Sequence, residues 1–378
     1  MINVCKCCKK GQLKIVDDFS IFGLVTSDCR LWRQPASLGF CLKCGLIQRP
    51  NERLWMEECE DIYGSYIPYP LGNNSEPRKF DQMIEGFEKR SVTVLRNFKE
   101  QYLREGVRNW LDFGCGDGQL LQNVQEEFPS LGLFGVDFGE KYRNQIEETS
   151  GATLLSRLPS RSQTFDIVSM FHVVEHLSDP VKDLKTIGET LSRRGLLLIQ
   201  VPNHEENPFD LVIFDHGSFF SKRTLELLLN KAGYIVRKIH KDWIRKELTA
   251  ICEYHGDGIH PDDQQEETEP VQLQQILEAH KGYLCDVIRE AEEKLKKHKT
   301  IKVFGSSIAA CWLVGEIGLE NIECFLDQDD SKWGSKLFGK DIREPGSDNL
   351  SEVVIPADRE TKLEVINTVF CSPDHSKQ

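Results

Sequence analysis

Short apolar runs alternate with amphipathic stretches through the middle of the chain. Apolar runs bounded by turn residues predict buried strands, whereas apolar positions three and four residues apart predict helices. The predicted strands are Trp110–Asp112, Leu131–Asp137, Ala152–Ser156, Thr164–Met170 and Gly195–Val201. The predicted helices are Gln119–Phe128, Pro180–Leu191 and Lys222–Ala232, the last capped by Ser221 and ended by Gly233. This alternation indicates a parallel α/β sheet covered by helices on both faces, with ligands at the carboxyl ends of its strands.

Different patterns flank this central part. We predict a helix from about Arg78 to Arg104, a polar linker over Gly256–Glu269 and a long helix over Pro270–Lys297. Two further strands, Thr300–Phe304 and Glu323–Asp327, predict a second α/β unit. A length of 378 residues exceeds one ordinary domain. We therefore divide the chain into residues 1–70, 71–253 and 254–378.

The turn after the first central strand carries both glycines and carboxylates. Gly114, Gly116 and Gly118 allow the backbone to bend and approach a ligand closely. Asp112 and Asp117 make the turn unlike a phosphate-binding loop, which presents bare N–H groups or a lysine. Carboxylates suit a ligand with hydroxyls or a cationic group instead. The turn resembles the first motif of class I methyltransferases that use S-adenosylmethionine (SAM), whose cofactor has an ammonium, a sulfonium and a ribose; a dinucleotide fold or a plain tight turn is the alternative.

Two further segments agree with that resemblance. Asp137 follows the glycine turn by about 20 residues, and an acid there can accept both ribose hydroxyls. The stretch from Phe171 to Pro180 is similar to the "EH-x-x-DP" signature of many small-molecule methyltransferases. The resemblance implies that Phe171, His172 and Glu175, together with the turn, bind SAM. His172 and His176 are equally well explained as structural groups at a strand end.

Composition excludes several classes of protein. The chain has 47 Lys and Arg against 60 Asp and Glu, a net charge of −13. The only basic run, Lys294–Lys299, ends a predicted helix, where cations favour the helix dipole. Nucleic acid is therefore not the expected partner. The absence of a long apolar run or signal segment predicts a soluble, cytoplasmic protein, with no membrane partner. Thirteen cysteines, an odd number, do not suggest a disulfide framework.

Seven of the cysteines lie within the first sixty residues. Two Cys-x-x-Cys pairs stand there, so Cys5, Cys8, Cys41 and Cys44 are the predicted ligands of a tetrahedral zinc, with Cys7 an alternative in the first pair. Four thiolates leave no open position, so the zinc is expected to be structural. A small N-terminal unit with a poor core would depend on it. Free cytosolic thiols are the alternative.

A tyrosine-rich segment connects this unit to the central one. Asp61–Pro70 places three tyrosines beside prolines, which predicts a loop. Tyrosine hydroxyls such as those of Tyr63 and Tyr66 can hydrogen-bond a ligand while the rings exclude water. A packed linker explains the segment equally well.

The combination of three units narrows the resemblance. A four-cysteine N-terminal unit, a Rossmann-like SAM domain, an acid–His–x–Ser–aromatic–Phe–Ser segment at 215–221 and a C-terminal α/β unit are similar to the sugar C-methyltransferase family. That family methylates nucleotide-linked keto-deoxysugars. The resemblance implies His216 as general base, with Asp215 and Tyr66 as further catalytic groups. It also makes Asn203, His204 and Tyr63 candidate substrate contacts.

The C-terminal unit carries its own part of the resemblance. Asp327–Gly339, with Lys332 and Gly334, resembles that family's "D-x-x-x-x-K-x-G…G" segment. The turn Gly305–Ser307 resembles a degraded nucleotide-binding turn, which we interpret as a diphosphate contact or a packing element.

Two departures keep other functions open. Ile213 stands where the family has a tyrosine, and Arg245–Leu248 replaces a Gly-Gly-Ser segment, so Lys246 becomes a candidate substrate contact. An O- or N-methyltransferase on the same scaffold, or a non-catalytic SAM-binding protein, therefore remains possible. The expected partner is a small molecule, a nucleotide sugar above all, and the expected state a monomer or weak homo-oligomer.

Overall fold

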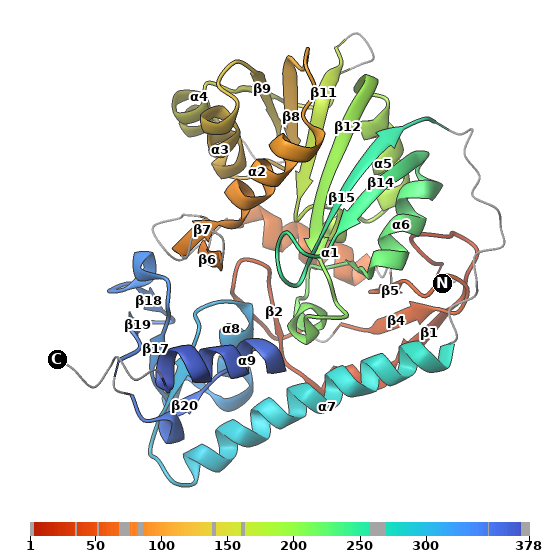
Figure 1. Ribbon diagram of the computed structural model, residues 1–378. Coiled ribbons are helices and arrows are strands. Elements are labelled where there is room, and N and C mark those ends of the chain that lie inside the picture. Colours follow the sequence, from red (N-terminus) through yellow and green to blue (C-terminus); the bar gives the residue numbers. More distant parts are fainter. Residues whose placement is uncertain are drawn as a thin grey trace.

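The computed structural model describes residues 4–34, 36–50, 53–67, 76, 78–81, 86–137, 141–159, 163–256, 270–346 and 348–371. Its largest element is a seven-stranded sheet in the order β10-β9-β8-β11-β12-β15-β14 (Figure 1). The strands are β8 (Asn109–Phe113), β9 (Gly132–Val136), β10 (Thr153–Leu155), β11 (Phe165–Phe171), β12 (Leu191–Pro202), β14 (Tyr234–His240) and β15 (Glu247–Tyr254). Strands β8 to β12 pair in parallel, and β15 runs antiparallel to both of its neighbours. The predicted α/β fold is confirmed.

Helices cover both faces of this sheet. Alternate residues of β8 point to opposite faces, so Trp110 packs with α2 (Arg90–Tyr102), α3 (Gln119–Glu127) and α4 (Arg143–Ser150). Leu111 packs on the other face with α5 (Pro180–Gly188) and α6 (Lys222–Lys231). Both side chains are fully buried. The predicted capping of α6 is confirmed, because the Ser221 side chain accepts from the backbone N–H of Thr224.

Three predicted elements are wrong in their bounds. The helix expected from Arg78 begins only at Arg90, and the hairpin of β6 (Arg78–Asp81) and β7 (Gly86–Lys89) precedes it. The Glu76 carboxylate fixes this start, because it accepts from the backbone N–H and the hydroxyl of Ser91 in the first helical turn. Helix α5 ends at Gly188, since Leu191 already pairs with Phe165 in the sheet.

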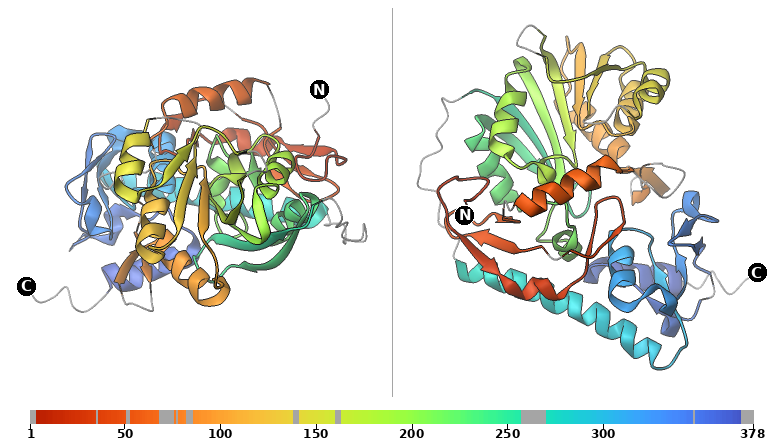
Figure 2. Two further views of the ribbon diagram at one scale, coloured as in Figure 1. Left: turned by 90° about the horizontal axis from the view of Figure 1, so that it is seen from above. Right: turned by 180° about the vertical axis from the view of Figure 1, so that it is seen from behind.

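The third correction concerns the tyrosine-rich segment. Residues 61–64, expected in a loop, form the last turn of α1 (Arg53–Gly64). Trp55, Cys59 and Ile62 are spaced as one helix face and are all buried, and this burial outweighs the turn signals that follow. Helix α1 crosses the end of the central sheet where β12 finishes (Figure 2). Residues 68–70 of the segment lie outside the described residues.

The N-terminal sheet includes one strand, β13 (Ser218–Phe219), that comes from the central part of the chain. Its order is β1-β4-β5-β13, from β1 (Leu13–Val16), β4 (Leu38–Cys41), β5 (Ile47–Gln48) and β13 (Ser218–Phe219). A ribbon of β2 (Leu24–Val25) and β3 (Leu31–Trp32) lies beside it. Since β13 follows His216 by two residues, the N-terminal sheet holds the segment expected to be catalytic.

A third sheet follows the long helix α7 (Pro270–Leu295), which runs beneath the N-terminal sheet (Figure 1). Its order is β18-β19-β17-β16-β20. The strands are β16 (Ile301–Phe304), β17 (Ile322–Leu326), β18 (Lys336–Leu337), β19 (Lys340–Arg343) and β20 (Val353–Val354), with helices α8 (Ile308–Ile317) and α9 (Arg359–Val365). Trp312 of α8 packs edge-on against Phe209 and Phe22, so one apolar core joins all three parts. The expected linker at 257–269 lies outside the described residues.

Among the helices of the described ranges, none combines the length and apolar character needed to cross a bilayer.

Candidate active site and metal centre

The glycine turn brings two of the predicted cofactor acids to neighbouring strand ends. Gly114 has φ +79°, and a Cβ there would lie 2.4 Å from a methyl carbon of Val173, so only glycine fits. The backbone N–H of Gly116 donates to Asp137 Oδ2 at 2.7 Å. Because Asp112 pairs in register with Gly135 near the end of β9, the two carboxylates flank one turn.

Asp112 is buried beneath the turn. The hydroxyl of Ser169, its register partner on β11, donates to Asp112 Oδ1 at 2.7 Å. Burial raises the pKa of Asp112 to about 7, against the lowering effect of that hydrogen bond. The fold therefore holds a carboxylate at this strand end at a cost in stability.

The segment after β11 contains an ion-pair network. Phe171 ends the strand, and His172 has a left-handed φ of +54°. Arg90 Nη1 lies 2.8 Å from His172 Nε2 and donates to Glu247 Oε1 at 3.2 Å. The role of Arg90 was not predicted from the sequence, because an arginine at the start of a helix belongs to no recognisable motif.

Glu175 lies in a short 3₁₀ turn, Val174–His176, and is 1% exposed. Neither of its carboxylate oxygens accepts a hydrogen bond from the described residues, although His172 Nδ1 lies 3.2 Å from one of them. Burial raises the pKa of Glu175 to about 8, and the neighbouring His216 opposes that rise. A buried carboxyl without a donor is costly, so this group is a candidate for contact with a ligand.

His216 is held by a carboxylate that sequence reasoning missed. Its Nδ1 lies 2.7 Å from Asp210 Oδ1, and the ring is 4% exposed. Burial by itself would lower the pKa of His216, but the carboxylates of Asp210, Glu175 and Asp215 outweigh it and raise the pKa. Asp210 lies in the 3₁₀ turn Pro208–Val212, six residues earlier, a spacing that matches no known motif.

His176 lies directly beside His216. The two rings meet edge to face with centroids 4.7 Å apart. Nδ1 of His176 is 2.9 Å from the hydroxyl of Tyr63 and 3.1 Å from the carbonyl oxygen of Asp215. Burial and the nearby His216 lower the pKa of His176 to about 4. Tyr63 is thus brought to the histidines by the last turn of α1.

The side chain of Asp215 is fixed by Ser27, another residue that the sequence analysis missed. The backbone N–H and hydroxyl of Ser27 donate to Asp215 at 2.8 and 2.5 Å. The same hydroxyl lies 3.3 Å from that of Tyr66. The three predicted catalytic residues, Asp215, His216 and Tyr66, therefore form one group.

The predicted substrate contacts lie further apart. Asn203 is fully buried, and its backbone N–H donates to the carbonyl oxygen of Lys246 at 2.8 Å. His204 faces α7, where its ring contacts His280, and burial lowers its pKa to about 3. Lys246 pairs through Nζ with Asp358 at 2.5 Å, just before α9. This pairing ties Lys246 to the C-terminal sheet region.

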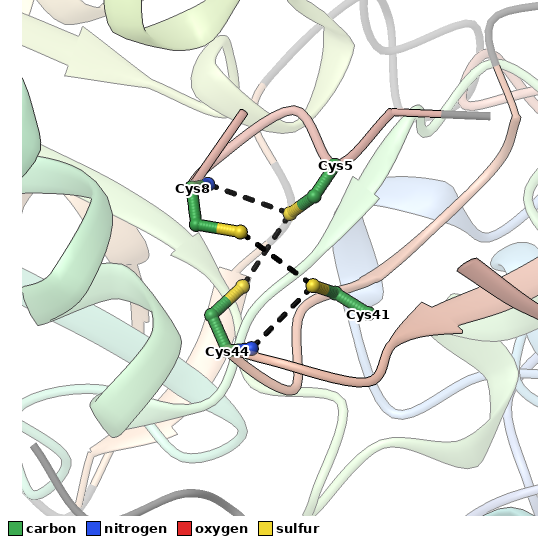
Figure 3. Close-up of side chains that lie close together, drawn as sticks. All are labelled: Cys5, Cys8, Cys41 and Cys44. Carbon is green, nitrogen blue, oxygen red and sulfur yellow. Dashed lines mark hydrogen bonds between the residues drawn. The ribbon is translucent and has the colours of Figure 1, made fainter. Parts of the chain in front are cut away.

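The four predicted zinc ligands converge (Figure 3). Cys5 Sγ lies 3.4 Å from Cys44 Sγ, and Cys8 Sγ lies 3.6 Å from Cys41 Sγ. A tetrahedron of thiolates about 2.3 Å from zinc has edges of about 3.8 Å, so the donor set fits. Cys7 is buried but does not belong to this group.

Backbone N–H groups face the sulfurs, as thiolate ligands require. The N–H of Cys8 lies 3.5 Å from Cys5 Sγ, and that of Cys44 lies 3.4 Å from Cys41 Sγ. The N–H of Gly11 lies 3.2 Å from Cys8 Sγ, and a Cβ on Gly11 would lie 2.0 Å from Cys41 Sγ. The cradle therefore excludes any larger residue at position 11.

The first cysteine pair also reaches the segment that contains Asp215 and His216. Lys6 is 1% exposed, and its ammonium donates to the carbonyl oxygen of Gly217 at 3.0 Å. The same ammonium lies 4.4 Å from the centre of the Trp55 ring, whose Nε1 donates to the carbonyl oxygen of Phe214. The buried guanidinium of Arg49 donates to the carbonyl oxygen of Ile213 at 2.8 Å. Three N-terminal side chains thus hold the backbone on both sides of His216.

Comparison with known proteins identifies the central part of the chain. Residues 87–239 match the family described as a methyltransferase domain. A tRNA U34 carboxymethyltransferase of Campylobacter jejuni is 29% identical over 135 residues, which cover 32% of this chain and 45% of that protein. A malonyl-[acyl-carrier protein] O-methyltransferase of Bacillus cereus is 23% identical over 194 residues, covering 50% of this chain and 68% of that protein. A SAM-dependent methyltransferase structure from Clostridium acetobutylicum covers 44% of this chain and 91% of its own, with 13% identity and a TM-score of 0.36.

The fold and the matched region define a class I SAM-dependent methyltransferase domain in the centre of this chain. The chain spans about 45% of the length of the tRNA-modifying relative, so the similarity concerns the domain and not the whole protein.

Proposed function

We propose that the protein is a SAM-dependent methyltransferase whose acceptor is a nucleotide-linked keto-deoxysugar, with His216 as general base. The observation that carries this proposal is the ordered histidine of the 215–221 segment. Its Nδ1 is held by Asp210 at 2.7 Å, and N-terminal side chains donate to the carbonyl oxygens of Ile213, Phe214 and Gly217 on both sides of it in the chain. A base held this firmly is suited to remove a proton from one defined position.

The cofactor would bind at the carboxyl ends of β8, β9 and β11. Asp137 is suited to the ribose hydroxyls, because it ends β9 beside the glycine turn. Gly114 and Gly116 allow the backbone to approach the cofactor, and Phe171, His172 and Glu175 complete the wall. When bound, SAM supplies a methyl group on a cationic sulfur.

His216 would remove the acceptor proton at Nε2, because Asp210 holds Nδ1 as the donor nitrogen. Removing a proton requires the neutral ring, and Asp210 then stabilises the imidazolium that forms. Asp215, Tyr66 and Tyr63 would help to position the acceptor beside His216, because Ser27 links Asp215 to Tyr66 and His176 contacts Tyr63. We also propose that Cys5, Cys8, Cys41 and Cys44 hold a structural zinc.

O- or N-methylation is the second candidate. It is favoured by Ile213, which is 6% exposed and offers no hydroxyl where the resembled family has a tyrosine to assist enolate formation. The net charge of −13 disfavours an RNA acceptor such as the one named for the Campylobacter relative.

The test is release of S-adenosylhomocysteine from SAM with nucleotide-linked sugars that carry or lack a keto group. Release with keto-sugars, and a methyl group that survives acid hydrolysis, would support C-methylation. Release with hydroxyl or amine compounds alone would move the proposal to O- or N-methylation. His216→Ala should abolish turnover while SAM still binds by calorimetry. If SAM does not bind the wild-type protein, the methyltransferase proposal fails.

A further inference from the structure

Glu175, His176 and His216 meet in a second cluster of metal-ligating side chains, apart from the four cysteines. One ligand atom from each residue lies within 4.8 Å of those from the other two. Glu175 and His216 are buried, and His176 is partly buried. Two imidazoles and one carboxylate are a donor set used for catalytic zinc and other divalent cations that prefer nitrogen and oxygen.

The hydrogen bonds around the cluster orient its ligands. Nδ1 of His216 is engaged by Asp210, and Nδ1 of His176 is engaged by the Tyr63 hydroxyl and the Asp215 carbonyl oxygen. Both rings therefore retain Nε2 as the ligand atom. A carboxylate or carbonyl on the other ring nitrogen is the usual arrangement behind a metal-bound histidine.

The carboxylate of Glu175 independently points to a bound ligand. It is 1% exposed, and within the described part of the chain no donor reaches either oxygen with hydrogen-bond geometry. Asp210 adds negative charge beside His216, and Asp215 adds it beside both His216 and His176. Although His172 Nδ1 lies 3.2 Å from one oxygen, a buried carboxylate that accepts no hydrogen bond and has further carboxylates nearby favours a cation.

We propose that Glu175, His176 and His216 form a second metal site, which takes a divalent cation such as Zn²⁺ and leaves coordination positions open. Binding displaces any proton from His216 Nε2 and occupies the lone pair of that nitrogen. The proposed function requires this same lone pair for the acceptor proton, so cation binding and proton transfer exclude each other. The second cation is therefore an inhibitor of methyl transfer, an effect that rests on the proposed function, whereas the site itself does not.

The experiment counts metal on the full-length protein dialysed against buffered Zn²⁺, by plasma mass spectrometry. We expect two zinc ions per chain in the wild type and one in both Glu175→Gln and His216→Gln. His255→Gln changes an exposed histidine that follows β15 and does not belong to the cluster, so this matched control should retain two. Substituting Co²⁺ distinguishes the sites, because only the cysteine site gives the intense sulfur-to-metal charge-transfer absorption. Thermal melting verifies that the variants fold.

Methyl transfer supplies the second readout. Filling the second site should reduce S-adenosylhomocysteine release at least tenfold, and a mild chelator that leaves the cysteine-bound ion should restore it. One ion per chain in the wild type, or two in both variants, would overturn the site. Activation by the second ion would overturn the inhibitory role. If no acceptor supports transfer, the proposed function fails and the metal count alone decides the site.

Discussion

The buried ammonium of Lys6 donates to the carbonyl oxygen of Gly217, the residue that follows His216. Lys6 stands between Cys5 and Cys8, so a side chain of the four-cysteine cluster directly contacts the backbone of the 215–221 segment. Replacing it leaves both the Trp55 ring and that carbonyl without their cation. The four-cysteine cluster is therefore linked through Lys6 to the backbone beside His216.

Lys6→Met should separate these two effects. The four cysteines remain, so zinc content should be unchanged, whereas kcat should fall by roughly tenfold to a hundredfold because the loop shifts. Burial lowers the pKa of Lys6 to about 7, so the cost of burying its charge offsets the lost hydrogen bond, and the unfolding free energy should change by less than about 1.5 kcal/mol. Zinc analysis, denaturant unfolding and steady-state kinetics check these outcomes. Lys43→Met changes an exposed lysine in the second cysteine pair and should leave all three at wild-type values. Equal kinetics for the two variants would contradict the coupling.

The pH dependence of turnover should report His216. Its pKa is raised by Asp210 and the other carboxylates, and the base must be neutral, so kcat should rise as pH increases through that raised pKa. Asp210→Asn removes a carboxylate that favours the imidazolium. In this variant, the rise of kcat with pH should occur at lower pH. The maximal rate should fall, because the His216 ring loses its orienting partner. An acid limb that stays in place would assign it to another group.

Asp112→Asn should stabilise the protein while weakening SAM binding. The folded pKa of about 7 lies above the unfolded value of 3.8, so the charged carboxylate costs stability, and this cost grows as pH rises from about 4 to about 7. An upper bound of roughly 4 kcal/mol follows from the shift of about three units. The increase in unfolding free energy of Asp112→Asn over the wild type should be absent below pH 4 and largest at pH 8. Calorimetric SAM affinity should fall tenfold or more, and thermal melts across pH test the stability.

Zinc removal should unfold the N-terminal sheet and abolish turnover together. Cys41→Ser removes one of four ligands and should cost several kcal/mol, because structural zinc contributes directly to folding. The control Cys59→Ser alters a buried cysteine outside the metal cluster and should retain zinc. Metal analysis with hydrogen exchange on residues 38–48 would check the result. Full turnover in zinc-free protein would contradict the dependence.

The pair of Lys246 and Asp358 should stabilise the contact between the central and C-terminal sheets. Despite some burial, the ammonium of Lys246 lowers the pKa of Asp358 to about 2. This stabilisation is present above the unfolded pKa of 3.8 and is lost as pH falls from about 4 to about 2, up to roughly 2 kcal/mol. A double-mutant cycle of Lys246→Met and Asp358→Asn measures it. If Lys246 also binds substrate, KM should rise in Lys246→Met but not in Asp358→Asn.

Local patterns in the sequence predicted the five parallel strands of the central sheet, the glycine turn and the two cysteine pairs, because each is defined by residues close together in the chain, whereas the antiparallel strands β14 and β15 were missed. The partners of the catalytic group could not be predicted in this way. Ser27 meets Asp215 across 188 residues, and Lys6 meets Gly217 across 211. Such contacts arise only when the N-terminal sheet takes β13 as its edge. The hairpin before α2 was missed for a related reason, since the helix start depends on Glu76, which lies outside it.

Because β5 pairs with β13, SAM binding should be possible without the N-terminal sheet, whereas methyl transfer should not. A fragment that begins after α1 would retain every strand of the central sheet, together with Asp112, the glycine turn and Asp137. It would lack the strand, the lysine and the arginine that hold residues 211–219. Such a fragment should bind SAM but not transfer its methyl group, so cofactor binding should need the central sheet alone, whereas methyl transfer should also need the N-terminal sheet.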